Sequence, residues 1–406
     1  MPNITVVGGG QASAQAVEIL RREGFDGQIV LVCEEPSLPY QRPPLSKKFL
    51  LDELSADRLL LRDQAFYDEH QIDLRVGIRA VSLSPELRQI TLSSGETLDY
   101  DQLLLCLGAT VRKLTTPGAE SARVRYLRSV ADVERLRPHL QLGTRLVIIG
   151  AGYIGLEVAA SAHKLGCTVH VLEMSDRVMS RVVAATVSEF FHGVHYAEGV
   201  NVLCNVRIVD VQDHREGARI RCSDGSVYDA DVILVGIGAL PNVQLAENAG
   251  LACDNGIVVD EYCRTSHPRI FAAGDCTSQP SLSSETRIRL ESVDNAVGQG
   301  TAAALNLLGR PTAHDRVPWF WSDQYDHKLL IVGLAHDHDQ QVTRGDPATG
   351  SFSICYLKRG VLVAVESVNQ TKDHMAARKL ITQRARPRIE RLADPAVPLK
   401  DAAEYP

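Results

Sequence analysis

The feature that most constrains this chain is a strand–glycine–helix–strand pattern with an acidic residue at its end. In "TRLVIIGAGYIGLEVAASAHKLGCTVHVLEM" an apolar strand precedes Gly150, Gly152 and Gly155, a helical pattern follows, and a second strand ends at Glu173. Glycines at this spacing permit a tight turn and close approach of the backbone to a pyrophosphate. The helix N-terminus then directs free N–H groups at the phosphates. The segment therefore predicts a Rossmann-type dinucleotide site.

A similar pattern stands near the start of the sequence. "ITVVGGGQAS" places Gly8 and Gly10 after an apolar run, with Ser13 where the third glycine usually stands. A serine is small enough for close packing of the helix on the strand. A second apolar strand follows and leads to Glu34, whose carboxylate can accept hydrogen bonds from ribose hydroxyls. This segment predicts a second nucleotide site.

Glu173 also bears on the choice of nicotinamide cofactor. A carboxylate at this position repels the 2′-phosphate of NADP and binds the free 2′-hydroxyl of NAD. Met174 and Ser175 follow it, although Arg177 is close enough to leave NADP open. Two dinucleotide sites on one chain predict two dinucleotides. A tightly held flavin and an exchangeable NADH are the simplest pairing.

The composition excludes several other classes of protein. The chain has 406 residues, of which 45% are hydrophobic and 23% charged, as is usual for a globular protein of two or three domains. A net charge of -7 argues against non-specific binding of nucleic acid, and no apolar run is long enough to span a membrane. Because no signal-peptide pattern is present either, the expected compartment is the cytoplasm.

The spacing of the nine cysteines excludes further chemistry. None forms C-x-x-C, a zinc-site spacing or an iron–sulfur spacing, so we expect buried thiols and no metal site. Without a close cysteine pair, a thiol–disulfide relay beside a flavin is excluded as well. Electrons would therefore leave a flavin directly for an external acceptor, and an iron–sulfur acceptor would have to be another protein.

Several longer motifs carry a resemblance to a known family. They are "YQRPPLSK" at Tyr40–Lys47, "RYLRS" at Arg125–Ser129, "IGAGYIGLEVAA" at Ile149–Ala160, "RIFAAGDC" at Arg269–Cys276, "RLESVDNA" at Arg289–Ala296, and "VPWFWSDQY", which holds both tryptophans of the chain. Nearly end to end, the sequence resembles flavoprotein reductases of the glutathione-reductase fold. It is most similar to the NADH-dependent ferredoxin reductases of bacterial oxygenase systems, the putidaredoxin-reductase and biphenyl-dioxygenase-reductase group.

This resemblance implies an α/β fold with two Rossmann-like dinucleotide-binding domains and a small C-terminal α+β domain. Residues 1–112 and 242–313 would form a discontinuous FAD domain, residues 113–241 an inserted NAD domain, and residues 314–406 a cap or interface domain. "DYDQLLLCLGA" would return the chain to the FAD domain, although its Cys106-Leu107-Gly108 departs from the family's Ala-Thr-Gly.

The same resemblance implies a function. The protein would be an FAD-containing NADH:ferredoxin oxidoreductase that passes electrons one at a time to a two-iron two-sulfur ferredoxin. That ferredoxin would supply a Rieske dioxygenase or a haem-thiolate monooxygenase. The alternatives within the fold are a rubredoxin reductase, an NADH oxidase, and a redox-sensing flavoprotein like apoptosis-inducing factor.

The resemblance also assigns roles to particular residues. Lys47 and Glu157 would form an ion pair beside the flavin N5, and Trp321 would stack with the nicotinamide, whereas Trp319 and Phe320 would pack in a domain interface. Asp275 would accept a hydrogen bond from the ribityl chain, between a strand and a helix. The residues implied for FAD are Gly8, Gly10, Ala12, Ser13, Glu34, Arg42, Lys47, Ala80, Arg128, Gly274, Asp275, Glu291 and Val293. The residues implied for NAD are Gly150, Gly152, Tyr153, Ile154, Gly155, Glu173, Gly236 and Gly238.

The last quarter of the chain reads as alternating strands followed by a helix over residues 371–383. A basic run begins within this helix and continues beyond it; it is either a docking patch for an acidic ferredoxin or a solvated helix end. Nucleic acid and membrane are not expected partners, and both a monomer and a homodimer are open. The basic run contains Arg378, Lys379, Arg384, Arg386, Arg388 and Arg391, and Arg62 and Lys328 could extend it.

Overall fold

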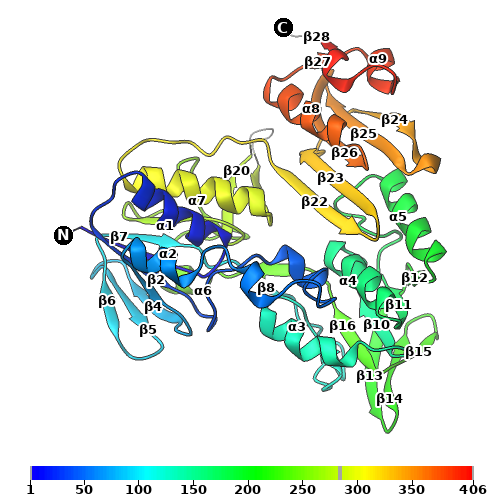
Figure 1. The fold of residues 1–406 in the computed structure, drawn as a ribbon, viewed down its shortest axis with the longest axis horizontal. Coiled ribbons are helices and arrows are strands. Elements are labelled where there is room, and N and C mark those ends of the chain that lie inside the picture. Colours follow the sequence, from blue (N-terminus) through cyan, green and yellow to red (C-terminus); the bar gives the residue numbers. More distant parts are fainter. Residues whose placement is uncertain (1, 282–285, 405–406) are drawn as a thin grey trace. The chain divides into compact units, whose positions relative to one another are not determined.

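The computed structural model describes residues 2–281 and 286–404 and contains two compact units (Figure 1). The first unit comprises the chain up to Gln41, Ala56–Thr110 and Leu240–Trp319. The second comprises Arg42–Ser55, Val111–Ala239 and the chain from Phe320 onward. The predicted mixed α/β architecture with parallel sheets is confirmed. The three domain boundaries drawn from the resemblance stay predictions.

A parallel sheet forms the centre of the first unit. Its strands lie in the order β19-β7-β1-β2-β3, and each neighbouring pair is parallel. Both faces are covered, which explains why the strands are nearly continuous apolar runs; in β1, for example, Ile4, Val6 and Val7 are all buried. The strands are β1 (Asn3–Val7), β2 (Gln28–Val32), β3 (Ile72–Arg75), β7 (Gln102–Leu105) and β19 (Ile270–Ala272).

Different elements cover the two faces of this sheet. Ile4 and Val6 belong to a core cluster that also contains residues of α1 and α7, and these two helices lie side by side (Figure 1). Val7 belongs to a second cluster with residues of the antiparallel sheet β4-β5-β6. The covering elements are α1 (Gln11–Arg22), α7 (Val293–Leu307), β4 (Ala80–Ser84), β5 (Gln89–Leu92) and β6 (Thr97–Asp99). Smaller elements are α2 (Gln64–Glu69), α6 (Gln244–Asn248), β18 (Ile257–Val258), β20 (Thr277–Pro280) and β21 (Arg287–Ile288).

The second unit contains a parallel sheet of the same kind. Its strands lie in the order β12-β11-β10-β16-β9. Val147 and Ile149 of β10 share a core with the antiparallel meander β13-β14-β15, and α4 packs on β10 and β11. The strands are β9 (Val124–Arg125), β10 (Arg145–Ile149), β11 (Thr168–Leu172), β12 (Asn201–Leu203), β13 (Ile208–His214), β14 (Gly217–Cys222), β15 (Val227–Ala230) and β16 (Val232–Val235). The helices are α3 (Val130–Leu136), α4 (Tyr153–Lys164) and α5 (Ala185–Ala197). The chain passes between the units at β8 (Ala109–Val111) and β17 (Ala239–Pro241).

An antiparallel sheet follows in the C-terminal part of the chain. Its strands lie in the order β22-β23-β26-β25-β24, and α8 packs on β26 and β23 (Figure 1). The strands and the helix expected here are confirmed, and α8 ends one residue before the predicted end. The strands of this sheet are β22 (Trp319–Gln324), β23 (His327–Gly333), β24 (Gln340–Asp346), β25 (Ser351–Lys358) and β26 (Val361–Val368). A separate two-stranded sheet contains β27 (Arg386–Pro387) and β28 (Ala403–Glu404). The helices are α8 (Thr371–Thr382) and α9 (Ile389–Ala393).

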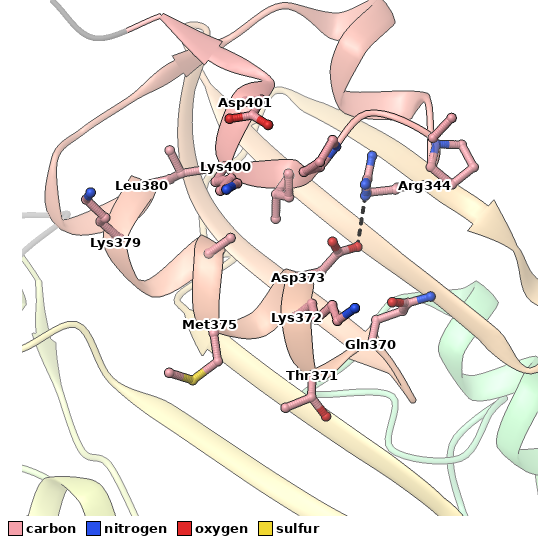
Figure 2. A pocket seen from close by; sticks show the side chains of 15 residues that line it. Arg344, Gln370, Thr371, Lys372, Asp373, Met375, Lys379, Leu380, Lys400 and Asp401 are labelled. Atoms are coloured by element: carbon pink, nitrogen blue, oxygen red, sulfur yellow. Dashed lines mark hydrogen bonds and ion pairs between the residues drawn. The ribbon is translucent and has the colours of Figure 1, made fainter.

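A buried ion pair ties the last segment of the chain to this sheet. Arg344 on β24 lies 2.8 Å from Asp373 on α8, and both side chains are almost completely buried (Figure 2). Since a buried guanidinium is costly to leave unpaired, its remaining donors bind the end of α9 and the segment that follows it. Those donors bind the backbone carbonyl oxygens of Leu392, Asp394 and Val397. A cavity of about 790 Å³ lies beside the pair, and its lining includes Lys372, Lys379 and Lys400.

A second buried acid, Glu366 on β26, joins the C-terminal sheet to the region around α5. Its carboxylate accepts a hydrogen bond from the Tyr356 hydroxyl at 2.7 Å and another from the Ala184 N–H at 2.9 Å. The side chain is 2% exposed, and this desolvation raises the pKa of Glu366 to about 7 despite both bonds and the nearby Arg177. The carboxyl group is therefore a pH-sensitive link within the second unit.

Replacing Glu366 with glutamine should flatten the pH dependence of stability. Because the pKa of Glu366 is raised from 4.5 to about 7, folding favours the protonated carboxyl group. Its contribution to the free energy of unfolding is fully present below pH 4.5 and is lost as the pH rises through 7. Between these limits the parent should lose about 3 kcal/mol of unfolding free energy relative to Glu366→Gln. Urea unfolding at a series of pH values measures this difference. The exposed Glu134→Gln is the control, and a difference that does not vary with pH would contradict the prediction.

A second prediction concerns the stability of the contact between α1 and α7 at Gly300. A Cβ at this position would lie 2.4 Å from the Ala12 carbonyl oxygen, so the helices approach this closely only because residue 300 is glycine. Gly300→Ala should destabilise the first unit by about 1–3 kcal/mol. Gly193 in α5 is the matched control, because a Cβ there meets no atom within 4 Å and Gly193→Ala should stabilise by about 0.5–1 kcal/mol. Thermal unfolding curves that move in the same direction for both variants would refute the close-contact argument.

Candidate cofactor sites and a buried ion pair

The first glycine-rich turn, after β1, leaves open space at the start of α1. Gly8 has φ +129°, and a Cβ there would lie 2.0 Å from the Cys106 carbonyl oxygen. Gly10 caps α1, and a Cβ at this position would meet no atom within 4 Å. The backbone at the helix N-terminus is therefore accessible, as a site for a phosphate group requires.

Ser13 closes the first turn of α1 from inside. The side chain is fully buried, and its hydroxyl donates to the Gly10 carbonyl oxygen at 2.9 Å and accepts from the Gly10 N–H at 3.1 Å. A hydroxyl at the position of the third glycine thus becomes part of the helix cap. Because the hydroxyl faces the protein's own backbone, Ser13 supports the turn and leaves the open side of Gly10 to a ligand.

Three elements of the first unit meet around Ala12. Gly274, in the loop after β19, has φ +87°, and a Cβ there would lie 3.3 Å from the Ala12 Cβ and 3.9 Å from the Ala296 Cβ. The loop therefore lies against the beginnings of both α1 and α7. Half-buried Asp275 follows Gly274, and Val293 is the first residue of α7. This arrangement fits a dinucleotide, because two helix N-termini and a carboxylate come from the same region.

The segment after Asp275 corrects one expectation. We expected a helix to begin there, but the chain continues as β20, and the next helix among the described residues is α7, which begins at Val293. The reason is that Ile257 and Val258 of β18 offer a parallel edge to which β20 pairs. The helix N-terminus near Asp275 is therefore that of α7, which is brought in by the fold.

A buried amide network around Gln299 was not anticipated from the sequence. Its Oε1 accepts hydrogen bonds from the Gly274 N–H at 2.7 Å and from the Thr277 hydroxyl at 2.9 Å. Its neighbours Gln279 and Asn295 are bonded to each other at 3.1 Å. The signal in the sequence is the spacing of Asn295 and Gln299, four residues apart and so on one face of α7. The network holds the Gly274 loop in place.

The other residues implied for FAD come from several elements of both units. Glu34 lies two residues beyond β2 with 68% of its side chain exposed, 3.8 Å from Arg79. Ala80 is buried at the start of β4, and Glu291 is exposed and pairs with Arg289. In the second unit, Arg42 and Arg128 are brought together, because the Arg42 guanidinium donates to the Arg128 carbonyl oxygen at 2.7 Å.

In the second unit, the glycines of the second motif converge. A Cβ at Gly150, which has φ +103°, would lie 2.6 Å from the Gly236 carbonyl oxygen, and a Cβ at Gly155 would lie 2.2 Å from the Gly150 carbonyl oxygen. Gly152 caps α4 and, like Gly10, has open space around its missing Cβ. Gly238 has φ +104° and follows the same strand as Gly236. The sequence motif therefore folds into a turn with an accessible helix N-terminus.

The first two residues of α4 differ in exposure. Ile154 is 46% exposed beside the open Gly152. Tyr153 packs on Phe320 with 4.6 Å between ring centroids, and burial together with the charge of Glu366 raises the pKa of its phenol. Tyr153 therefore stays neutral and supports the helix start from the protein side.

Glu173 lies over the glycine turn, as a ribose-binding acid requires. One carboxylate oxygen accepts from the Ala151 N–H and the other from the Ser175 N–H, both at 2.7 Å. Arg177, which the sequence left open as a ligand for a 2′-phosphate, points elsewhere. Its guanidinium binds the Ser188 hydroxyl at 2.6 Å and the carbonyl oxygens of Val183 and Ser180 at 2.9 and 2.8 Å.

The ion pair expected from the resemblance is present in the second unit. Lys47 Nζ lies 2.9 Å from Glu157 Oε2, and the two side chains are only 19% and 6% exposed. The Ser46 hydroxyl donates to the same carboxylate oxygen at 2.5 Å, and the Ser322 hydroxyl donates to Oε1 at 2.7 Å. The sequence missed both serines, because Ser322 is distant in the chain and Ser46 reads as a helix cap. The buried carboxylate is therefore fully satisfied.

The aromatic segment forms an extended strand, β22, and its two faces differ. Ser322 and Gln324 are completely buried on the face that also carries Phe320. Trp321 and Asp323 are half-buried on the opposite face. The contact of Trp321 with a nicotinamide and the interface packing of Trp319 stay predictions.

The proposed docking residues are distributed over several elements. Arg62 pairs with Glu18 at 2.6 Å, and Lys328 lies 3.9 Å from Asp323. Of the basic run, Arg378 and Lys379 lie on α8, whereas Arg391 lies on α9. The docking patch stays a prediction.

Three further features concern the thiols, metal ions and membranes. All nine cysteines lie in the described segments and carry free thiols. Within residues 2–281 and 286–404, no His, Cys, Asp and Glu side chains gather in a group of three or more that could hold a metal ion. Across the same residues, no helix has both the length and the apolar character needed to cross a membrane.

Comparisons with known proteins agree over almost the whole chain. A family model described as pyridine nucleotide-disulphide oxidoreductase matches residues 2–300, and one described as reductase C-terminal matches residues 319–403. The 5,5′-dehydrodivanillate O-demethylase ferredoxin reductase subunit of Sphingobium sp. is 42% identical over 399 residues, which cover 98% of this chain and 97% of that protein.

Solved structures extend this agreement to three dimensions. The ferredoxin reductase for the CYP199A2 system from Rhodopseudomonas palustris is 39% identical, with a TM-score of 0.96 over 100% of both chains. Putidaredoxin reductase in its covalent complex with putidaredoxin is 37% identical, with a TM-score of 0.95 over 98% of this chain and 97% of that one. The chain thus belongs to the pyridine nucleotide-disulphide oxidoreductase family, among relatives that are named ferredoxin reductases.

Proposed function

We propose that this protein is an FAD-containing NADH:ferredoxin oxidoreductase whose partner is a two-iron two-sulfur ferredoxin that supplies an oxygenase. The observation that carries the proposal is the extent of the likeness, because relatives named ferredoxin reductases match at about 40% identity from end to end, C-terminal segment included. A bound flavin supplies the conversion between a two-electron donor and a one-electron acceptor. The chain's own residues bind and orient the two dinucleotides.

The open turn at Gly10 and the adjoining Gly274 loop fit the FAD. In the proposal, the N-termini of α1 and α7 face phosphate oxygens, and Asp275 accepts a hydrogen bond from a sugar hydroxyl. The support is the contact of Gly274 with both Ala12 and Ala296. Glu34 is exposed and so is able to reach a ribose.

The open turn at Gly152 fits NADH rather than NADPH. Glu173 already accepts two backbone N–H groups over this turn, which places a negative charge where a 2′-phosphate would have to lie. Arg177 is held by Val183, Ser188 and Ser180 and offers no compensating cation.

Lys47 and Glu157 shape the hydride-transfer pocket in this proposal. By the resemblance, the pair stands beside the flavin N5 and Trp321 stacks with the nicotinamide. Hydride transfer requires alignment and exclusion of water more than proton transfer, and a buried, fully hydrogen-bonded pair meets this need. The pair therefore acts as a rigid wall of the pocket.

The ferredoxin, the compartment and the assembly complete the proposal. A basic patch that includes Lys379 and Arg391 would speed docking of an acidic ferredoxin. Free thiols at all nine cysteines suit the reducing cytoplasm. Monomer and homodimer are both compatible with these roles.

Replacing Glu173 with alanine and Ser175 with arginine should shift cofactor preference toward NADPH. The change removes a repulsive carboxylate and adds a partner for the 2′-phosphate, so the NADH/NADPH ratio of kcat/KM should fall by roughly 10–100-fold. Steady-state kinetics with both cofactors measure the ratio. Glu173→Ala alone is the control, because it also releases the Ala151 and Ser175 N–H groups. An unchanged ratio in the double variant would count against the NAD site.

Ferredoxin reduction tests the proposed function as a whole. The FAD-loaded protein is reduced with NADH in a stopped-flow instrument and then mixed with two-iron ferredoxins, with rubredoxin in parallel. Rapid ferredoxin reduction and slow oxygen uptake are the expected results. Fast oxygen consumption without a carrier would instead identify an oxidase, and the absence of electron transfer to any ferredoxin would end the proposal.

A further inference from the structure

A chain of hydrogen bonds leads away from the second oxygen of Glu157. Oε1 accepts from the Ser322 hydroxyl at 2.7 Å, and that hydroxyl accepts from the Gln324 amide at 3.2 Å. Gln324 Oε1 lies 3.0 Å from His195 Nε2, and His195 Nδ1 lies 3.2 Å from the Tyr325 hydroxyl. The chain thus joins α4, β22 and α5 within the second unit.

The middle of this chain is completely buried. Ser322, Gln324 and His195 each have 0% exposure. Burying a hydroxyl, an amide and an imidazole is unfavourable unless every one of them is bonded, and apolar side chains could fill the same volume. The arrangement is therefore a specific feature of this core.

The donors of the chain all point toward Glu157. Burial lowers the pKa of His195 to about 4, so near neutral pH its ring is uncharged, with one nitrogen donating and the other accepting. The arrangement that satisfies every group has Tyr325 O–H donating to Nδ1 and Nε2–H donating to Gln324. From there the Gln324 amide donates to Ser322, which donates to the carboxylate. Aligned donors of this kind stabilise a negative charge at their end.

The chemistry of the Gln324 amide, the central group of the hydrogen-bond chain, distinguishes a proton relay from a positioning role. A proton relay needs groups that accept one proton and release another, as a hydroxyl or an imidazole does. The Gln324 amide does not do this readily, so it interrupts proton transfer between His195 and Ser322. The hydrogen-bond chain is therefore suited to positioning the Glu157 carboxylate.

We propose that Ser322, Gln324 and His195 are positioning residues that hold Glu157 Oε1 and so keep Oε2 aimed at Lys47. The inference rests on the proposed NADH reaction at this site and deepens it. Ser46 and Lys47 bind Oε2 from the segment around residue 46, whereas Ser322 of the hydrogen-bond chain binds Oε1 from β22. With both oxygens held, the carboxylate has no freedom to rotate, and the ammonium group of Lys47 is fixed with it.

Ser322→Ala tests the proposal, because it removes only the donor to Oε1. The limiting rate of flavin reduction by NADH should fall by about tenfold, the usual effect of losing a hydrogen bond to a charged group, with the NADH dissociation constant nearly unchanged. Ser322→Thr keeps the hydroxyl and should restore most of the rate. Ser353→Ala is the matched control, because Ser353 is another fully buried serine of the same sheet whose partners are Ser367 and Asp373.

A second measurement follows the ion pair without any cofactor. In flavin-free protein, acetic anhydride should label Lys47 several-fold faster in Ser322→Ala than in the parent, whereas Ser353→Ala should leave the rate unchanged. Mass spectrometry of the Lys47 peptide gives the rate. If Ser322→Ala does not fold, Gln324→Met is used, since methionine nearly matches the shape of glutamine and lacks both the N–H donors and the oxygen acceptor of the amide.

The outcomes separate this inference from the proposed function. Equal effects of Ser322→Ala and Ser353→Ala on the reduction rate and on Lys47 labelling would overturn the positioning role. So would a slow Ser322→Ala that threonine does not rescue. Both readouts are taken before ferredoxin is added, so a parent that fails to reduce ferredoxin ends the proposed function and leaves the positioning result standing.

Discussion

The burial of the Glu157 carboxylate constrains the second unit more than any other interaction. A charge removed from water is strongly destabilising unless donors surround it, and here the donors come from distant parts of the chain. Ser46 and Lys47 lie about 110 residues before Glu157, and Ser322 lies 165 residues after it. The start of α4 is therefore tied to both the segment around residue 46 and strand β22. This requirement accounts for the buried polar chain behind Ser322.

The two glycine-rich turns both leave the N-terminus of a helix open, but different residues support each turn. Both caps, Gly10 and Gly152, leave space where a side chain would stand. In the first turn the helix start is closed from inside by the Ser13 hydroxyl, and in the second Gly155 lets α4 approach the Gly150 carbonyl oxygen directly. The acids differ as well, because Glu34 is exposed whereas Glu173 already binds backbone amides. One turn therefore presents an exposed carboxylate, and the other presents a carboxylate held in position by backbone N–H groups.

Local sequence patterns were sufficient to predict most helices and strands, but they could not predict contacts that depend on tertiary packing. Apolar runs with glycine turns and helical spacing identified β1, α1, β10 and α4. A strand buried on both faces is a continuous apolar run, and a helix packed on one side has apolar residues at helical spacing. The helix expected after Asp275 was wrong, since β18 supplied a strand edge that no local pattern reports. Arg177 was left open as a phosphate ligand, and only the folded loop shows that its donors are used by Ser188 and neighbouring carbonyl oxygens.

The sequence by itself determined the two glycine-rich turns, the α/β class, the absence of a C-x-x-C pair and the family resemblance. These properties reside in residue types at fixed short spacings, where backbone geometry leaves few alternatives. Tertiary structure alone decided that Phe320, Ser322 and Gln324 share a buried face and that Ser322 meets Glu157. Whether a polar side chain in a strand is solvated or buried depends on what packs against that face. The partners of a buried charge are therefore set by the assembled fold.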